Sequence, residues 1–526
     1  MNDTNTLTRR DFLKVGAAAF TTALLPNLNT KAASRYNVLF ITVDDLRPML
    51  GCYGHPEMHT PNIDAIAERG TLFTRAYCQY PLCSPSRTSL FIGLRPETTQ
   101  VRNNTADFRE KIPETVTLPQ HFKANGYHTQ SVGRIAHLPR LQDDANSWSL
   151  PSWRPLWVPF DIKTSLSWQA LDVADDALRD GKAAKRAIKV LESLKNHTFF
   201  LAVGFYKPHL PLEAPRKYFE LYDTADFTLP ASPVPPEDAP ARALNNWSAI
   251  RAYADLPSGN EPLSDEQTLA LIRAYAATTS YTDAQIGRVL AQLDALGLTE
   301  NTVIVFCSDH GHHLGEQGMW GKQTLFESSL RVPLIVSVPG SSRAETDALV
   351  ELVDIFPTLS DVCELPSPLR SEGTSLQPVL ENPRFPWKTA AFSQFASGRS
   401  IRTARYRYTE WGNNGNRGKE LYDYQTDPHE TRNIVNLPEN ATLVAHLSER
   451  LKAGWQRAVP GMQEHVPVPQ TQPADVNNDG VVNIQDLVRV ANKFGESGGI
   501  AIPEDVNNDG VVDIRDLVRV ANHFGN

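Results

Sequence analysis

Short apolar runs and longer helical segments alternate along the first three quarters of the chain. The runs cover residues 37–43, 127–132, 199–205, 302–307 and 332–338, and their length and β-branched content predict buried strands. Between them lie segments such as residues 269–296, whose apolar residues recur at helical spacing. This alternation predicts an α/β domain with a largely parallel sheet over residues 35–390.

The pattern changes after about residue 391, where short strands rich in arginine and tyrosine follow one another. Residues 400–403 and 405–408 are two of these strands. They predict a smaller C-terminal α+β subdomain over residues 391–465. Residues 466–474 are rich in proline and without periodicity, which predicts a stiff linker.

Two nearly identical repeats, residues 475–492 and 505–522, follow the linker. Each places oxygen-bearing side chains at loop positions 1, 3, 5, 9 and 12, glycine at position 6 and a backbone carbonyl at position 7, as a calcium loop requires. Each loop leads into an amphipathic helix. The predicted ligands are Asp475, Asn477, Asp479, Val481, Asn483 and Asp486, then Asp505, Asn507, Asp509, Val511, Asp513 and Asp516.

This small helical module, residues 475–526, resembles a type I dockerin. The resemblance implies two bound Ca²⁺ ions and a cohesin-type partner, and therefore attachment. A stabilising or surface-anchoring role stays open.

The N-terminus is predicted to be an export signal rather than part of the fold. Arg9 and Arg10 precede an apolar run over residues 15–25, which is about half the ~20 residues that a spanning helix needs. The paired arginines resemble a twin-arginine signal, here residues 1–34. We therefore expect a periplasmic, cell-surface or extracellular protein without a membrane span.

The net charge of the chain limits the kinds of partner that it is expected to bind. The 526 residues carry a formal net charge of -9. This argues against nucleic acid and anionic membranes as partners. An anionic substrate would need a local cluster of positive side chains.

Five cysteines are too few for a disulfide scaffold, and none belongs to a CxxC pair. Cys307 lies in an apolar run and is predicted to be a small buried hydrophobe. Whether Cys52 and Cys78 pair stays open.

Polar side chains gather where four of the predicted strands end. In an open α/β sheet, ligands bind beyond the carboxyl ends of the strands, so these side chains are expected to share one crevice. They are Asp44, Asp45, Arg134, His137, Lys207, His209, Asp309 and His310, with Lys322 in the next loop.

The sharpest local motif is Cys83-Ser84-Pro85-Ser86-Arg87. Ser84 is predicted to cap a helix and Pro85 to occupy its first position. Cys83 would then lie at the positive end of the helix dipole, about one turn from Arg87, and both favour an anion there. A free cysteine and an unmodified cysteine nucleophile are the plainer alternatives.

The motif, with Gly93-Leu94-Arg95-Pro96 after it, resembles the signature of type I sulfatases. Further matching stretches lie within residues 36–436 and are closest to the iduronate-2-sulfatase branch: residues 43–48, 200–204, 207–209, 308–311, 400–403, 406–409 and 420–423. The resemblance implies an alkaline-phosphatase-like fold, with the sheet sandwiched by helices. It also implies that a separate maturation enzyme oxidises Cys83 to formylglycine.

The resemblance further implies the roles of the clustered residues. The metal ligands would be Asp44, Asp45, the modified Cys83, Asp309 and His310. The catalytic residues would be Cys83, Arg87, His137, His209 and Lys322, and the substrate contacts Arg134, Lys207, His209 and Lys322. Oxygen ligands favour Ca²⁺ or Mg²⁺, and the family favours Ca²⁺. Arg134 departs from the family, which usually has lysine there, so the geometry of the sulfate contact is expected to differ.

The expected activity is hydrolysis of sulfate esters on a sulfated glycan, with 2-O-sulfated uronic acid as a candidate substrate. One alternative is a phosphate or phosphonate ester hydrolase of the same superfamily. Against it, these Asp and His residues hold one metal and leave no second histidine-rich cluster. A non-catalytic, dockerin-tethered glycan-binding protein is the other alternative.

Overall fold

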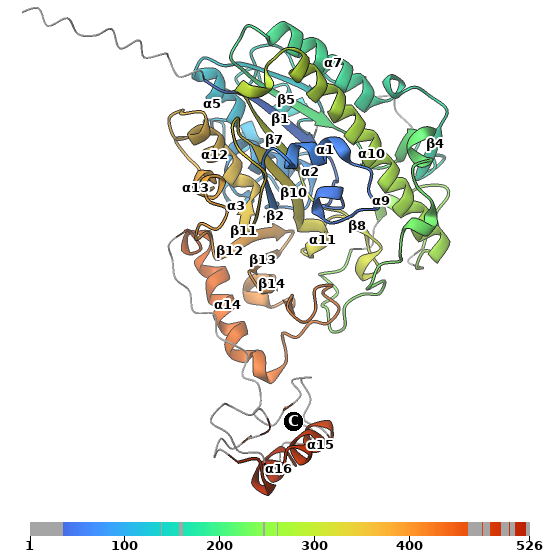
Figure 1. The fold of residues 1–526 in the computed structure, drawn as a ribbon, viewed down its shortest axis with the longest axis vertical. Helices are drawn as coiled ribbons and strands as arrows, with labels where there is room; N and C mark the ends of the chain where they lie inside the picture. The colour runs from blue at the N-terminus through green and yellow to red at the C-terminus, as the bar shows by residue number, and fades with distance from the viewer. Residues whose placement is uncertain are drawn as a thin grey trace, which may run out of the picture. The chain divides into compact units, whose positions relative to one another are not determined.

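In the computed structural model of the chain, seven strands form a central sheet (Figure 1). Their order is β11 (Ala344–Glu351), β2 (Thr71–Tyr77), β10 (Arg331–Ser337), β7 (Thr302–Ser308), β1 (Asn37–Val43), β5 (Phe199–Phe205) and β3 (His128–Gly133). The structure describes residues 35–137, 139–156, 161–245, 248–259, 261–460, 476, 484–495, 504, 506 and 511–521.

The sheet, which is predicted to be largely parallel, is mixed. Strand β10 is antiparallel to both β2 and β7, whereas the other pairings are parallel. Residues 309–330 connect β7 to β10 and keep the chain at one end of these two strands, so β10 runs back in the opposite direction. A parallel partner would need a crossover to the opposite edge.

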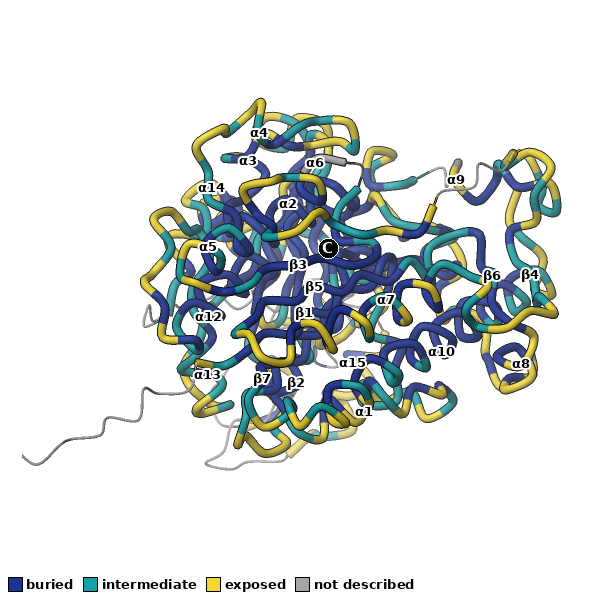
Figure 2. The backbone as a smooth tube through the Cα atoms, turned by 90° about the horizontal axis from the view of Figure 1, so that it is seen from above, coloured by how far each residue is buried: buried dark blue, intermediate teal, exposed yellow. Residues whose placement is uncertain are grey.

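Two layers of helices cover the sheet (Figure 1). On one face lie α1 (Pro61–Ala67), α7 (Arg179–Leu194) and α10 (Asp265–Ala295). On the other lie α2 (Cys83–Ile92), α5 (Leu118–Ala124) and α12 (Ile355–Val362). Figure 2 shows the central strands dark blue, because β1, β5 and β7 are buried along their whole length. The predicted strands and the long predicted helix are confirmed.

Shorter elements complete the part of the fold built on the central sheet. Two small ribbons pair β4 (Trp168–Leu171) with β6 (Leu212–Pro215) and β8 (His313–Leu314) with β9 (Trp320–Gly321). The short helices are α3 (Pro96–Thr99), α4 (Phe108–Lys111), α6 (Pro139–Gln142), α8 (Arg216–Phe219), α9 (Ser248–Arg251), α11 (Glu327–Leu330) and α13 (Gln377–Glu381). Among the described residues, no helix combines the length and the apolarity needed to cross a bilayer.

A four-stranded antiparallel sheet follows, in the part of the chain where the smaller subdomain is predicted. It contains β12 (Ala390–Phe395), β13 (Gly398–Thr403), β14 (Tyr406–Trp411) and β15 (Lys419–Asp423) in that order. Helix α14 (Ala441–Ala453) packs its leucines against this sheet.

The repeats are described in part. Helices α15 (Ile484–Asn492) and α16 (Ile514–Ala521) are present and share a small valine core. The predicted signal (1–34), the linker (466–474) and several predicted calcium ligands lie outside the described residues. These ligands are Asp475, Asn477, Asp479, Val481, Asn483, Asp505, Asn507 and Asp509.

A buried ion network joins the central sheet to the second sheet. Glu351, at the end of β11, receives both terminal nitrogens of Arg95 at 2.7 and 2.6 Å. Its carboxylate also accepts from Lys388 Nζ at 2.9 Å and from the backbone N–H of Phe392 at 2.9 Å. Burial opposes the charge on Glu351, but Arg95 and Lys388 more than offset it and hold its pKa at about 2.

Replacing Glu351 with alanine should destabilise the protein by about 3–5 kcal/mol, because Arg95 would be left buried without this carboxylate, although Lys388 would keep its ion pair with Asp354. The loss would be read as a shift of the urea unfolding midpoint. The wild-type pKa is lowered, so this stabilisation is present above the ordinary glutamate pKa of about 4.3 and disappears as the pH falls toward 2.

The exposed pair of Arg343 and Glu68, 2.6 Å apart, provides the matched control. Glu68→Ala should cost no more than about 1 kcal/mol. Equal small losses for both variants would contradict a structural role of the buried network.

Candidate active site

Two neighbouring strands deliver four polar side chains to one place. Strand β1 ends at Val43 and is followed by Asp44 and Asp45, while β7 ends at Ser308 and is followed by Asp309 and His310. Val43 and Ser308 are register partners, so the two pairs start side by side. All four side chains are at most 1% exposed. The predicted convergence of these strand ends is confirmed.

The turn after β1 is held from several directions. Asp45 has a positive φ of 63°, which is uncommon outside glycine and asparagine, and its backbone N–H donates to Asp309 Oδ1 at 3.2 Å. The hydroxyl of Tyr275, on α10, donates to the carbonyl of Asp45 at 2.7 Å. These contacts fix where the two carboxylates point.

Cys83 is the first residue of α2 and is 1% exposed. The predicted cap at Ser84 is wrong by two residues, because Leu82 occupies the cap position with extended backbone and offers no side-chain hydrogen bond. The first turn is bound from elsewhere: Asn104 Oδ1 accepts from the Ser84 N–H at 3.0 Å. Asn104 was not predicted, since nothing local in the sequence marks a cap that comes from a separate loop.

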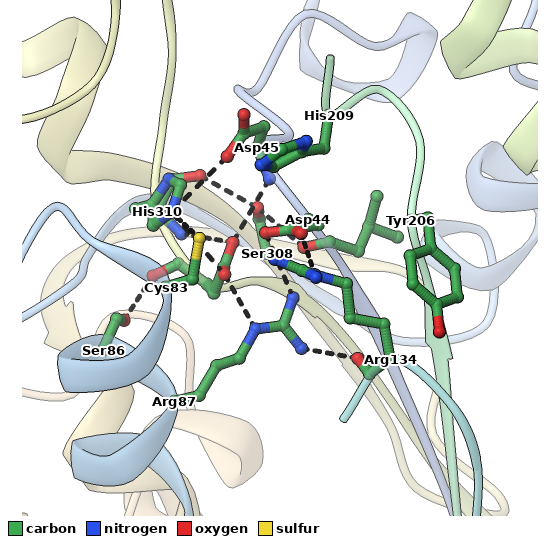
Figure 3. A network of polar contacts seen from close by, with 12 residues as sticks. Asp44, Asp45, Cys83, Ser86, Arg87, Arg134, Tyr206, His209, Ser308 and His310 are labelled. Carbon is green, nitrogen blue, oxygen red and sulfur yellow. Dashed lines mark hydrogen bonds and ion pairs between the residues drawn. The ribbon is translucent and has the colours of Figure 1, made fainter. Parts of the chain in front are cut away.

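Arg87 connects three strand ends. Its Nε lies 2.8 Å from Asp309 Oδ2, its Nη2 lies 3.4 Å from Asp44 Oδ1, and its Nη1 donates to the carbonyl of Arg134 at 2.6 Å (Figure 3). The guanidinium is 1% exposed, and these partners compensate for its burial. The helix that carries Cys83 is thereby fixed to β1, β7 and the residue after β3.

Four groups form a candidate metal site. Ligand atoms of Asp44, Cys83, Asp309 and His310 all lie within 4.8 Å of one another, and Asp45, Cys83 and His209 form an overlapping group. Both carboxylate oxygens of Asp44 are buried without a hydrogen-bond partner, although two guanidiniums lie near them. Such oxygens suit a hard cation. Cys83 Sγ, 3.4 Å from His310 Nε2, stands where an oxygen of a modified side chain would be (Figure 3).

The charges in this group act on a bound cation in two opposite ways: the ionised Asp44 would attract it, and a protonated His310 would oppose it. Burial opposes ionisation of Asp44, but Arg134 and Arg87 outweigh it and hold the pKa of Asp44 well below its usual range. Burial also disfavours charge on His310, yet Asp309 beside it raises the pKa of this imidazole to about 9. A cation bound here would therefore compete with the proton on His310.

The loop after β3 supplies Arg134 and His137. Gly133 has a φ of 80°, and a Cβ there would lie 2.0 Å from the carbonyl oxygen of Gly204, so only glycine lets β3 and β5 approach so closely. Arg134 Nε forms an ion pair with Asp44. Burial, with Arg134 nearby, lowers the pKa of His137 to about 4, so its imidazole is neutral at pH 7.

The loop after β5 supplies Lys207 and His209. The Lys207 ammonium donates to the carbonyls of His209 and Pro211, so it braces this loop, and its predicted contact with substrate stays a prediction. His209 Nδ1 lies 2.8 Å from the carbonyl of Leu210, an arrangement that leaves Nε2 as the free acceptor of a neutral ring. Burial lowers the pKa of His209 to about 4.

Lys322 lies in the turn after β9, and its ammonium forms an ion pair with Asp45. Burial disfavours the charge, but Asp45 raises the pKa of Lys322 above its ordinary value. His312 is a further buried residue at this site, with Nδ1 3.5 Å from Asp45 Oδ2 and its ring stacked on Tyr275. It was not predicted, although it follows His310 by two residues in the same loop.

A cavity of about 640 Å³ opens onto these groups. Its lining includes Asp45, Cys83, Arg134, His137, Lys207, His209, His312 and Lys322. A second groove of about 660 Å³ lies against β4 and α10, and none of the predicted catalytic residues lines it.

All five cysteines are free, and Cys307 is buried as predicted. Cys52 and Cys78 form no disulfide.

The chain matches known family models and is similar to individual proteins of known activity. Residues 36–365 match the sulfatase family model, and residues 315–457 match the model described as N-sulphoglucosamine sulphohydrolase, C-terminal. Iduronate 2-sulfatase from Mus musculus is 33% identical over an alignment that covers 79% of this chain and 94% of that protein. A sulfatase from Formosa agariphila is 31% identical, with 77% and 84% covered.

The fold is also found in solved structures. The phosphonate monoester hydrolase of Agrobacterium radiobacter superposes with a TM-score of 0.69 and is 24% identical, covering 83% of this chain and all of that one. This likeness concerns the fold alone.

The candidate metal site should lose its cation when Asp309 is changed to asparagine. Metal analysis of dialysed protein is expected to find one divalent ion fewer than in the wild type, because a carboxylate ligand becomes a neutral amide. Asp44→Asn should have the same effect.

Asp172→Asn serves as the control, since this carboxylate is exposed and forms an ion pair with Arg216. An unchanged metal content in both site variants would mean that the ion binds elsewhere.

Proposed function

Because the chain belongs to the sulfatase family, we propose that it hydrolyses sulfate esters of a sulfated glycan, with Cys83 as the precursor of a formylglycine. One observation carries the proposal: Cys83 lies at the start of a helix, in one buried group with two carboxylates and an imidazole. Neither a free structural cysteine nor a plain thiol nucleophile requires a cluster of cation ligands around its sulfur.

The modification would supply what a thiol lacks. A hydrated formylglycine carries two geminal hydroxyls, of which one attacks sulfur and the other allows sulfate to leave as the aldehyde re-forms. A cysteine that had taken up sulfate has no geminal oxygen, so its turnover would stop after one step. The maturation enzyme is therefore a required partner in this proposal.

Positive groups would bind the sulfate during the attack. Lys322 is held charged by Asp45 and lines the cavity with Cys83, so its Nζ can approach the bridging oxygen and give a proton to the leaving alcohol. His209 presents Nε2 to the same space. Arg87 acts indirectly, because its guanidinium holds Asp309 and the loop of Arg134 in place.

His137 is the proposed base for the second step. Its Nδ1 is buried without a hydrogen-bond partner among the described residues, and the ring is neutral at pH 7 because its pKa is near 4. A neutral imidazole that lines the same cavity as Cys83 can accept the proton of the second hydroxyl. Sulfate is then expelled.

The proposed cation is Ca²⁺, with Mg²⁺ as the alternative. Asp44, Asp45 and Asp309 offer hard oxygen ligands, and His310 adds one nitrogen. A divalent ion would polarise the nucleophile and the sulfate oxygens. The oxygen-rich ligand set favours the larger and more flexible coordination of Ca²⁺.

The proposed substrate is a 2-O-sulfated uronic acid within a glycan. Support comes from the iduronate 2-sulfatase of Mus musculus, which is similar over 79% of this chain. Incubation with defined sulfated saccharides, followed by measurement of released sulfate, would test this directly.

Cys83→Ser should abolish multiple turnover of an aryl sulfate, because an unoxidised serine has one hydroxyl and no geminal oxygen from which to expel sulfate. If the first step still occurs in this variant, the protein should instead accumulate as a single sulfated species, which an intact-mass measurement would detect. In the wild type, the peptide containing residue 83 should be ~18 Da lighter than its cysteine form, as expected for oxidation of the thiol to an aldehyde.

An aryl phosphate assayed in parallel distinguishes the rival ester hydrolase. Faster turnover of phosphate than of sulfate would reject the proposed activity, and so would normal turnover by Cys83→Ser. Unmodified Cys83 without any turnover would favour a non-catalytic glycan-binding protein.

We also propose that residues 475–526 form a dockerin-like module that binds two Ca²⁺ ions and a cohesin-type partner. Asp486 and Asp516, at position 12 of their loops, are fully buried, and Asp516 Oδ2 accepts from the Asp513 N–H at 2.8 Å. Equivalent apolar residues of α15 and α16 are exposed, Val488 at 52% and Val518 at 50%. Such a duplicated surface suits a protein partner. Export by the twin-arginine route, directed by residues 1–34, would bring the chain to such a partner.

The double variant Asp486→Ala, Asp516→Ala should bind two calcium ions fewer than the wild type and lose affinity for immobilised cohesin. Calcium titration calorimetry and binding with and without EDTA measure these effects. Asp172→Ala, which removes an exposed carboxylate outside the repeats, is the control. Retained calcium binding in the double variant would refute the assignment of these loops.

A further inference from the structure

The cavity at Cys83 continues past the sulfate-binding groups to the first turn of α7. Arg179 and Lys182 line it there, together with Tyr206 and Glu213. Building on the proposed function, we propose that Arg179 and Lys182 bind a second anionic group of the substrate, a carboxylate or another sulfate, and so select saccharides that carry two negative charges. These two residues would then determine specificity without taking part in the chemistry.

The positive groups near Cys83 are already compensated. Arg134 pairs with Asp44, Lys322 with Asp45, and Arg87 with both Asp44 and Asp309. The ammonium of Lys207 is directed at backbone carbonyls. One sulfate can be held between these groups, but a second anion would need positive charge farther along the cavity.

Arg179 supplies such charge at a defined distance from Arg134. The guanidinium carbon of Arg134 lies 5.7 Å from the centre of the Tyr206 ring, and that of Arg179 lies 5.2 Å from the same centre. The two guanidiniums are therefore no farther apart than the sum of these distances, with an aromatic ring beside both. Figure 3 shows Tyr206 next to Arg134, on the side away from Cys83.

Lys182 reinforces this wall of the cavity. It is three residues after Arg179, so the two side chains are neighbours on the helix surface. It is exposed, and it lines the cavity together with Arg179. An arginine fork and a flexible ammonium together bind carboxylate or sulfate oxygens well.

Two acidic residues, Asp180 and Glu213, lie near Arg179. Asp180 is fully buried and accepts from the N–H groups of Tyr206 and Lys207, at 2.7 and 2.9 Å, so it fixes the loop rather than facing the substrate. Glu213 lines the cavity and acts favourably on the charge of Arg179. Burial lowers the pKa of Arg179, and an anionic ligand group would offset that cost.

The test is kinetic and uses the matured full-length enzyme with three substrates. These are a 2-O-sulfated uronic acid disaccharide, a disulfated glucosamine and a monosulfated aryl ester. Arg179→Ala should raise KM for at least one of the two doubly charged substrates by about 10- to 100-fold, because one charge-assisted hydrogen bond contributes about 1.5–3 kcal/mol. The aryl ester should be affected much less.

Lys182→Ala should act in the same direction with a smaller change, and Arg179→Lys should restore part of the loss. An effect confined to the uronic acid identifies a carboxylate as the second anion, and one confined to the disulfated sugar identifies a sulfate. Lys185→Ala is the matched control, since this lysine lies on the same helix, is exposed, and pairs with Asp176 at 3.2 Å without lining the cavity.

Several results would overturn the inference. One is an equal loss for all three substrates, which indicates a structural role, and another is no change in KM for either doubly charged substrate. A wild type that prefers the aryl ester to both would also overturn it. Failure of the wild type to release sulfate from any substrate would instead refute the proposed function itself.

Discussion

The contact between Arg87 and Asp309 is the interaction on which the site depends. It lies in the protein interior, where a guanidinium without a partner would be strongly unfavourable. Because Arg87 is on α2 and Asp309 follows β7, their ion pair fixes the helix that carries Cys83 against the sheet. The same guanidinium reaches Asp44 and the carbonyl of Arg134, so three strand ends are aligned by one side chain.

Such a concentration of buried charge does not serve stability. A buried ion cluster seldom contributes more than a well-packed apolar core would, since each ion first loses its hydration. Here the oxygens of Asp44 are even left without hydrogen bonds. The rest of the domain, with strands β1, β5 and β7 buried along their whole length, supplies the hydrophobic free energy that permits this arrangement. The cluster is therefore best explained by the cation that we propose it binds.

Much of the fold could be predicted from local patterns, and the failures have physical causes. Strands β1 and β5 match their predicted bounds to the residue, because fully buried strands are continuous apolar runs. Strand β2 was missed because it carries threonines and Arg75, and β11 because it is an edge strand with polar residues on one side. Asn104 and His312 belong to the site through contacts that only the folded chain creates.

The departure at position 134 has a consequence for the shape of the site. A guanidinium can form an ion pair through one nitrogen while its planar face lies near an aromatic ring, whereas a lysine ammonium is a single point charge. Arg134 does both, since Nε pairs with Asp44 and the group lies near Tyr206. Tyr206 in turn lies near Arg179. Arginine at this position thus extends the positive lining of the cavity from the buried carboxylates toward α7, which a lysine held by Asp44 would not do.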